Sequence, residues 1–560
     1  MDDHRRMVAH GKIHEGWLDV AKRRTVPRKP PAGPHALTDA AGAKALDTEA
    51  SAHWGLDPFA LVEAAGRACA HVFTRSTLAR SGSRIFHQRE FIVLAGSGNN
   101  AADALVMLRA LVLGGHAEPG SCLVLVCRLP EDDGTAGRTP LSQAVVAIRK
   151  LGVRVKAWDA GKPALASAGP HRILIDGIAG TGLDGPLRGA ALEMAEAANV
   201  LGREPGNGTT VVSIDIPSGA FDGWRPGMPI VAARGTLAIE PRKLCLYTPA
   251  IRPNAGAILP VGGIFPAELV GKYRDAELLS WENAAAGIGP VPPTAHKYMR
   301  GLVEIRAGSK GATGAARLAA LGSQAAGAGM VRLIVDPSLY AIMASACSGV
   351  MVAPATAEDT GKEGRFSPAA VLLGPGWGRG DDRMRLLESC LPFEKQGRPL
   401  VLDADAIDLA KDAVFHGNAI MTPHVGEFAA CTGFSKDEIL SDPAWVLRGF
   451  AAEKQATVLL KSHVMYVASP DGRLGIIDGM NPVLAAGGSG DVLAGFCAAI
   501  AARGVQDGNR FDGYACACAA ASLLVRAADS KGIANSFVDP EKLVHAAAAI
   551  AGGAWIRREK

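Results

Sequence analysis

Short apolar runs alternate with helical patterns along most of this chain. In the first half these runs contain few polar positions and stop at glycine or aspartate. Strands of this kind are buried on both faces, which is typical of a parallel sheet covered by helices. The expected strands are Phe91–Ala95, Ser121–Val126, Arg172–Asp176, Thr210–Asp215 and Gly235–Ile239. Apolar residues at helical spacing predict helices at Leu56–Phe73, Asn99–Leu113 and Leu141–Leu151.

The alternation resumes after a stretch rich in proline and glycine at residues 284–295, which is typical of a linker. The expected strands are Gly301–Ile305, Val331–Val335, Ala370–Leu373, Pro399–Leu402, Asn418–Met421, Thr457–Leu460 and Met465–Ala468. Ala-rich helices are expected at Thr313–Ala328 and Phe511–Ala527. The pattern predicts two α/β domains, at residues 36–275 and 299–556, joined by a linker at 276–298.

Composition narrows the class of protein. A chain of 560 residues is too long for one ordinary domain, and a net charge of +4 argues against nucleic-acid binding. Residues 1–35 mix basic with acidic side chains and have no apolar segment, so we predict a disordered basic lead and no secretory signal. No apolar run is long enough to span a membrane. Ten scattered cysteines favour a reducing, cytoplasmic location.

Polar or glycine-rich segments follow the strands of the second half. They are Gly374–Gly378, Asp403–Asp405, Thr422–Glu427, Lys461 and Gly487–Asp491. Ligands of open parallel sheets bind beyond the carboxyl ends of the strands, where such segments meet. We therefore expect the five segments to form one site.

The segment Gly487–Asp491 is a glycine-rich turn that opens into an apolar helix. Glycine lets backbone N–H groups converge, and the helix adds the positive end of its dipole, so the turn can bind an anion. Asp491 at its mouth could take a proton from a hydroxyl that is being phosphorylated. The alternative is a tight turn in which Asp491 only caps the helix.

These segments, in this order, resemble those of the ADP- or ATP-dependent NAD(P)H-hydrate dehydratases, which have a ribokinase-like fold. The resemblance covers residues 296–555 and extends to Ala307–Ala316 and Ala326–Val331. Residues 36–275 resemble the NAD(P)H-hydrate epimerase domain, a Rossmann-like three-layer sandwich. The segments that carry this second likeness are Leu61–Gly66, Gly96–Asp103, Asp176–Leu183 and Ser213–Gly219. Together the halves resemble the bifunctional NAD(P)H-hydrate repair enzymes.

The resemblance implies roles in the second domain. Asp491 would be the catalytic base, and the amides of Gly488, Ser489 and Gly490 would hold phosphate. ADP or ATP, with magnesium, would contact Lys461, Ser462, His463, Val464 and Met465, and the hydrate would contact Ala315, Gly376 and His424. Each has a plainer reading: His424 could cap a turn, Lys461 could be an exposed lysine, and Asp403 and Asp405 could cap the next helix.

In the first domain the resemblance implies that Asp215 is the acid or base that inverts the hydroxyl-bearing carbon. Asn100, Asp176 and Ser218 would supply oxygen ligands for potassium. The hydrated dinucleotides NADHX and NADPHX would be held by two loops, with residues Asn99, Asn100, Ala101, Ala102, Asp103, Gly180, Thr181, Gly182, Leu183, Asp184, Gly185 and Pro186. Asp176 and Asp215 could instead cap turns at strand ends. We also expect a homo-oligomer.

The chain departs from the family pattern in two places. The family has Asn-Asn-Gly-Gly-Asp-Gly where this chain has three alanines, in Asn99–Ala104. Alanine at positive φ would cost about 1 kcal/mol or more, whereas alanine in a first helical turn is favourable, and the sequence leaves both open. In the second domain, Met465 stands where the family has a threonine that contacts the nucleotide.

Two other functions are compatible with these residues. A ribokinase-like small-molecule kinase would share the glycine turn and the aspartate base. The first domain could also be a degenerate epimerase that is fused to an active dehydratase.

Overall fold

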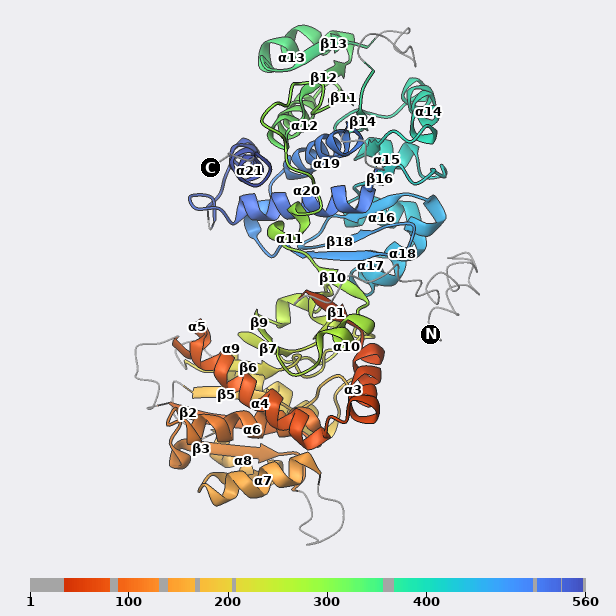
Figure 1. Ribbon diagram of the computed structural model, residues 1–560. Coiled ribbons are helices and arrows are strands. Elements are labelled where there is room, and N and C mark those ends of the chain that lie inside the picture. Colours follow the sequence, from red (N-terminus) through yellow and green to blue (C-terminus); the bar gives the residue numbers. More distant parts are fainter. Residues whose placement is uncertain are drawn as a thin grey trace. The chain divides into compact units, whose positions relative to one another are not determined.

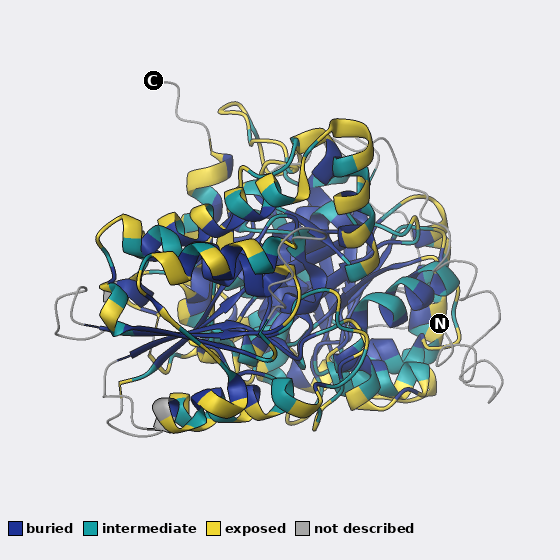
Figure 2. Ribbon diagram, turned by 90° about the horizontal axis from the view of Figure 1, so that it is seen from below, coloured by how far each residue is buried: buried dark blue, intermediate teal, exposed yellow. Residues whose placement is uncertain are grey.

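The computed structural model describes residues 35–80, 89–129, 139–166, 172–203, 208–355, 367–506, 511–534 and 536–556. The basic lead predicted at residues 1–35 lies, apart from His35, outside the described residues. The chain forms two compact α/β units that divide between Ala276 and Glu277 (Figure 1). Strands are buried along most of their length, whereas many helices expose one face (Figure 2).

The first unit contains a seven-stranded parallel sheet. Its order is β4 (Arg154–Ala157), β3 (Cys122–Val126), β2 (Glu90–Ala95), β5 (Arg172–Gly177), β6 (Thr210–Ile214), β7 (Gly235–Ile239) and β9 (Ala257–Val261). One core lies against α4 (Pro58–Arg75), α6 (Asn99–Leu113) and α7 (Pro140–Lys150), and another against α8 (Trp158–Ala166) and α9 (Gly189–Arg203). The unit is therefore the three-layer sandwich that we predict.

Short elements complete the first unit beside the main sheet. Strand β1 (Ala36–Thr38) pairs in parallel with β8 (Arg242–Lys243). The helices here are α3 (Ala40–Trp54), α5 (Thr77–Arg80) and α10 (Ala267–Lys272).

The second unit contains a mainly parallel sheet. Its order is β13 (Met351–Pro354), β12 (Met330–Val335), β11 (Leu302–Arg306), β14 (Ala370–Leu373), β15 (Leu400–Leu402), β16 (Ala419–Met421), β17 (Thr457–Leu460), β18 (Val464–Ala468) and β19 (Leu474–Asp478). Pairing is parallel up to β17, and β17, β18 and β19 are antiparallel. The remaining helices are α13 (Tyr340–Ala346), α14 (Asp381–Lys395), α15 (Asp405–Leu409), α16 (Val425–Thr432), α17 (Lys436–Ser441) and α18 (Pro443–Lys454).

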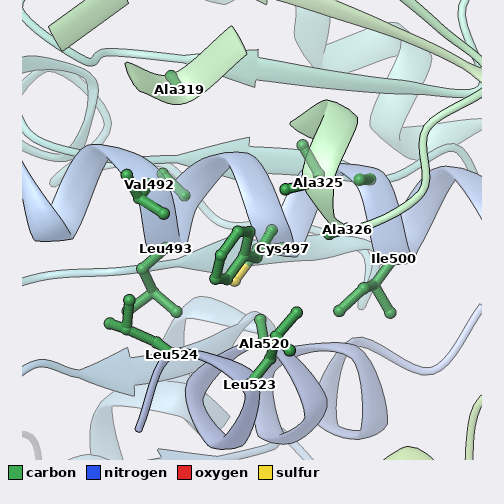
Figure 3. Close-up of a cluster of buried hydrophobic side chains, with 14 of the residues drawn as sticks. Ala319, Ala325, Ala326, Val492, Leu493, Cys497, Ile500, Ala520, Leu523 and Leu524 are labelled. Carbon is green, nitrogen blue, oxygen red and sulfur yellow. The ribbon is translucent and has the colours of Figure 1, made fainter. Parts of the chain in front are cut away.

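The main core of this unit surrounds α19 (Ser489–Gln506). Side chains of α19 lie between those of α12 (Thr313–Ala325) and α20 (Gly513–Ala528) (Figure 3). Glycines let α12 and α19 approach closely, because a Cβ on Gly495 would lie 2.2 Å from the carbonyl oxygen of Ala319. Helix α21 (Pro540–Trp555) packs on the same core.

Part of the segment that we predict as a linker is built into the second unit. Glu277 and Leu278, of β10 (Ala276–Leu278), pair with β19. Helix α11 (Trp281–Ala285) follows. The ring of Trp281 packs edge-on against that of Trp555, with 5.1 Å between the ring centroids. Proline and glycine at residues 289–293 mark the loop that follows this helix, so they do not define the start of the unit.

The strands predicted from apolar runs agree with the structure to within one residue at each end. The strands that sequence reasoning missed are short or polar, such as β4, whose side chains alternate between exposed and half-buried. The parallel pairing predicted for the first sheet is confirmed. In the second sheet, the antiparallel pairing of β17, β18 and β19 was not predicted.

The three alanines of Asn99–Ala104 lie in a helix. Helix α6 starts at Asn99 behind Gly98, and no alanine in it has positive φ. Ala101, Ala102 and Ala104 are buried, and the Cβ of Ala104 lies 2.6 Å from the place that a Cβ on Gly177 would take. Of the two readings left open by the sequence, the favourable one is correct: alanine here stabilises the helix and does not strain it.

Restoring a glycine at this site should therefore destabilise the first unit. Ala102→Gly loses helix propensity and a buried methyl group, which together are worth about 1–2 kcal/mol. Urea unfolding, followed by hydrogen exchange of the amides of α6, measures the change. An increase in stability on Ala102→Gly would contradict this view of α6.

Candidate active sites

Four adjacent strands of the second sheet bring the predicted motifs to one edge. In the order β14, β15, β16 and β17 each strand pairs in parallel with the next. Backbone bonds continue beyond the strand ends: the amide of Asp403 donates to Leu373, that of Thr422 to Leu402, and that of Lys461 to Pro423. The expectation that these segments meet at one edge is thus realised.

A buried ion pair joins two of these segments. Lys461 Nζ donates to Asp403 Oδ1 at 2.6 Å, and Thr422 Oγ1 donates to the same oxygen at 2.7 Å. Burial lowers the pKa of Lys461, but the carboxylates of Asp403, Glu427 and Asp491 outweigh it, so the pKa lies above its usual value. Lys461 is thus not an ordinary exposed lysine, and its ammonium is charged in the neutral range.

The glycine turn adds the start of α19 to this edge. Gly488 has φ of +100°, and a Cβ there would lie 2.4 Å from Leu318 Cδ1, so glycine is required. Ser489 Oγ donates to the carbonyls of Leu484 and Ala486, which holds the turn closed. A Cβ on Gly490 would lie 3.4 Å from Lys461 Nζ. The ammonium therefore lies close to the N-terminus of α19, the end at which the helix dipole is positive.

Asp491 lies in the first turn of α19, where the charges of Asp403, Lys461 and Glu427 all act on it. Burial, and then the charge of Asp403, raise its pKa to about 6, against the lowering effect of Lys461. A carboxyl with a pKa just below the working pH is mostly ionised and still accepts a proton well, which suits a general base.

The loop Gly374–Gly378 is shaped by contacts that only glycine allows. Gly374 has φ of +118°, and a Cβ there would lie 1.7 Å from the carbonyl oxygen of Asp403. A Cβ on Gly376 would lie 3.1 Å from the Cβ of Ala315, so these two predicted hydrate contacts are neighbours. The Gly378 amide donates to Asp405 Oδ2 at 2.8 Å. Neither Asp403 nor Asp405 caps α15; Asp403 holds Lys461, and Asp405 holds this loop.

Three other predicted contacts, His424, Val464 and Met465, have structural roles. His424 Nδ1 accepts from the amides of Gly426 and Glu427, so it caps α16. This was the plainer reading of His424; its Nε2 lies 3.4 Å from Glu427 Oε1, on a side chain that is still largely exposed. The side chains of Val464 and Met465 are buried in β18. Among the five predicted nucleotide contacts, Lys461, Ser462 and His463 are the ones whose side chains reach solvent.

The first unit has a cavity of about 700 Å³ beyond the carboxyl ends of its central strands. Predicted site residues that line it are Asn99, Asn100, Asp103, Gly180, Thr181, Gly182, Leu183 and Asp215. Ala101 and Ala102 belong to the core beneath α6, and residues 184–186 lie outside the lining. The two predicted loops therefore meet at one cavity, but not through every residue.

Asp215 lines this cavity and has an unusual backbone geometry. Its φ is +66°, a conformation that non-glycine residues rarely adopt, and Lys243 Nζ donates to its Oδ1 at 2.7 Å. Burial raises the pKa of Asp215, while Lys243 opposes that rise. Such strain is typical of functional positions, and the ion pair shows that Asp215 is not merely capping a turn.

A group of oxygen atoms lies beside the cavity. The Asp176 carboxylate accepts from Ser213 Oγ at 2.7 Å and from Ser218 Oγ at 2.5 Å, and it is fully buried. Asn100 Nδ2 donates to the carbonyl of Ala179, which also accepts from Ser218 Oγ. Asn100 Oδ1 is buried and, among the described residues, accepts no hydrogen bond. Oxygen atoms with this orphaned acceptor fit a monovalent cation.

Sequence reasoning missed several residues of the cavity wall. Lys44 and Asp47 come from α3, and Lys243 follows β7 by only a few positions. Lys243 could have been found from the sequence, because it is a basic residue just beyond a predicted strand of a parallel sheet. Lys44 and Asp47 carried none, because α3 precedes the sheet in the sequence.

Comparison with known proteins places both units in one family. Residues 303–548 match the family model described as NAD(P)H-hydrate dehydratase, and residues 58–245 match that of the YjeF-related protein N-terminus. A bifunctional NAD(P)H-hydrate repair enzyme of Gloeobacter violaceus is 32% identical over 432 residues, which are 73% of this chain and 79% of the relative. The chain belongs to the family of bifunctional NAD(P)H-hydrate repair enzymes.

Other members of the repair-enzyme family match a larger share of the chain. The Moorella thermoacetica enzyme is 29% identical over 503 residues, 84% of this chain and 89% of the relative. Among solved structures, the ADP/ATP-dependent NAD(P)H-hydrate dehydratase of Bacillus subtilis is 24% identical, with a TM-score of 0.42, over 49% of this chain and 96% of that chain. The family predicted from the sequence is confirmed.

Within the described part of the chain, no helix is long and apolar enough to cross a membrane. All ten cysteines are unpaired, and most are buried.

The raised pKa of Asp491 has a consequence for stability. A carboxyl whose pKa is 3.8 when unfolded and about 6 when folded makes the protein less stable as pH rises through that window. The loss is about 2–3 kcal/mol above pH 6. Asp491→Asn should therefore be more stable than the parent chain above about pH 6, and the difference should shrink towards pH 4.

Thermal unfolding at a series of pH values measures this difference. Asp437→Asn is the matched control, since Asp437 is exposed in the first turn of α17. An Asp491→Asn variant that is less stable than the parent at pH 8 would contradict the account of the Asp491 environment.

Proposed function

We propose that this chain repairs hydrated NADH and NADPH, with dehydration in the second unit and epimerisation in the first. The observation that carries the proposal is the joint presence of Asp491, Lys461 and the N-terminus of α19 at one sheet edge. The family membership and the cavity around Asp215 support the second activity.

Dehydration needs a better leaving group than hydroxide, and phosphorylation of the ring hydroxyl supplies one. In the second unit Asp491 would accept the hydroxyl proton as the terminal phosphate of ADP or ATP is transferred. Lys461 and the amides that start α19 would stabilise the charge that develops on the transferred phosphate. Loss of phosphate, together with a proton from the neighbouring ring carbon, then restores the double bond.

Specific contacts in the second unit follow from the geometry. Gly376 and Ala315 would take the hydrate together, because they are neighbours at this sheet edge. The nucleotide would lie along Lys461, Ser462 and His463 and against Gly488–Gly490, with magnesium on its phosphates. Because Val464 and Met465 are buried, the contact made by the family threonine would be lost in this chain.

In the first unit Asp215 would move the proton during opening and reclosure of the hydrate at its hydroxyl-bearing carbon. Asn100, Asp176 and Ser218 would hold potassium, which would place positive charge beside the dinucleotide. Since the alanines of α6 are helical and do not fill the cavity, the departure from the family pattern does not indicate a degenerate epimerase. We infer a cytoplasmic homo-oligomer that acts on small molecules.

Replacing the proposed base tests the dehydratase assignment. Asp491→Asn should lower dehydration of the S hydrate by at least about 10³-fold while leaving nucleotide affinity nearly unchanged, because the amide cannot accept the proton. The kcat/KM of the parent should fall as pH drops through about 6, where Asp491 becomes protonated.

Recovery of reduced-nicotinamide absorbance measures the first quantity, and calorimetric titration with ADP or ATP measures the second. Undiminished dehydration by Asp491→Asn would remove Asp491 from the role of base. Accumulation of a stable phosphorylated product would favour a small-molecule kinase instead.

The epimerase assignment has its own test. Asp215→Asn should reduce conversion of pure R hydrate into S hydrate, without nucleotide, to the spontaneous rate, because the amide cannot carry a proton. Chromatographic separation of the two epimers measures the conversion. Dehydration of S hydrate by the same variant should be unchanged, which shows that the chain is folded.

A further inference from the structure

The cavity of the first unit contains more buried carboxyl groups than buried cations. Among its charged lining residues, Asp103, Asp215 and Lys243 are buried, with exposed fractions of 8%, 7% and 6%. Glu240 accepts from the amides of Gly263, Ile264 and Phe265 and is thus satisfied by backbone. One ammonium therefore faces two buried carboxyl groups, and it can neutralise only one of them.

Lys243 is committed to Asp215 and not to Asp103. Its Nζ donates to Asp215 Oδ1 at 2.7 Å and to the carbonyl of Ile239 at 3.1 Å, so two donor positions are fixed. Asp103 Oδ1 is buried and has no hydrogen-bond partner among the described residues. An ionised carboxylate in that position would be strongly disfavoured, whereas a protonated carboxyl is tolerated.

The other titratable groups near Asp215 do not change this balance. Burial raises the pKa of the thiols of Cys69 and Cys245 well above the usual value, so both are neutral. Asp47, on α3, lies on the more exposed part of the wall; burial and the charge of Asp215 raise its pKa against the lowering effect of Lys243, but the hydrogen bond of that lysine goes to Asp215. Burial and then the charge of Asp215 raise the pKa of Asp103 well above its usual value. In one cavity wall, Lys243 therefore favours the ionised form of Asp215, while burial favours the protonated form of Asp103.

We propose that Lys243 is a positioning residue of the epimerase: its ammonium keeps Asp215 ionised as the base and leaves the proton of the cavity on Asp103. The proposal rests on the proposed epimerase function. Hydroxyl inversion through opening and reclosure of the hydrate needs one group that accepts a proton and one that donates it, so the pair would serve both directions. Lys243 need not touch the substrate; it decides which carboxyl carries the proton.

The test compares epimerase pH profiles of variants that remove or keep the charge. Lys243→Met removes charge and hydrogen bond, Lys243→Gln keeps a donor without charge, and Lys243→Arg keeps the charge. In Lys243→Met and Lys243→Gln, the acid limb of the kcat profile should move to a pH about one unit or more higher. At pH 7, kcat should then fall about tenfold. Lys243→Arg should keep the limb near that of the parent.

Three controls separate the possible failures. Dehydration of S hydrate with ADP reports on the second unit of the same molecule and should not change. Lys162→Met removes a lysine that pairs with Glu193 outside the cavity lining, and should leave the epimerase profile intact. The double variant Asp215→Asn with Lys243→Met contains no unpaired buried charge, and should be no slower than Asp215→Asn alone.

The outcomes are distinct. Parent-like pH profiles in both Lys243→Met and Lys243→Gln would overturn the proposed role of Lys243. If the epimerase rate falls in all three variants, Lys243→Arg included, and the acid limb of kcat does not move, then Lys243 has only a structural role. That result would also overturn the proposal. If Asp215→Asn itself keeps the parent rate, the proposed epimerase assignment fails, and the role of Lys243 fails with it.

Discussion

Both sites depend on a lysine that is buried or half-buried and faces more carboxyl groups than it can neutralise. In the second unit Lys461 is bonded to Asp403 while Asp491 lies within reach of both charges. In the first unit Lys243 is bonded to Asp215, while Asp103 Oδ1 has no hydrogen-bond partner among the described residues. Burial makes each surplus carboxyl hold its proton more tightly, and the lysine determines which carboxyl is ionised. Proton transfer near neutral pH follows from this arrangement.

The two folds produce this arrangement by the same topological route. Parallel strands leave their carboxyl ends on one edge, so a residue just beyond each strand meets its neighbours from the next strand. Asp403 follows β15 and Lys461 follows β17, while Asp215 follows β6 and Lys243 lies beyond β7. The backbone is bent to aim these side chains: Ala404 and Asp215 both have positive φ. The strain is local, and the strands that precede it, β6 and β15, are fully buried.

Much of this was open to prediction because it depends on local patterns. Continuous apolar runs located the strands, and the residues that follow them located both sites. The ion pairs were not predictable, since Asp403 and Lys461 are 58 positions apart and nothing in the sequence pairs them. The same holds for Lys44 and Asp47, which reach the cavity from a helix outside the strand order. Whether the alanines in Asn99–Ala104 are helical depends on where α6 begins. Hydrophobic periodicity locates the start of a helix only to within about one turn, so the sequence left this question open.

The bifunctional account is tested most directly by supplying pure R hydrate of NADH to the whole chain with ADP or ATP. Dehydration of the S form alone cannot consume this substrate, so recovery requires both units to act in sequence. We predict full recovery of reduced-nicotinamide absorbance at a rate well above that of spontaneous epimerisation. Recovery no faster than the spontaneous rate, in a preparation that dehydrates S hydrate normally, would contradict the account.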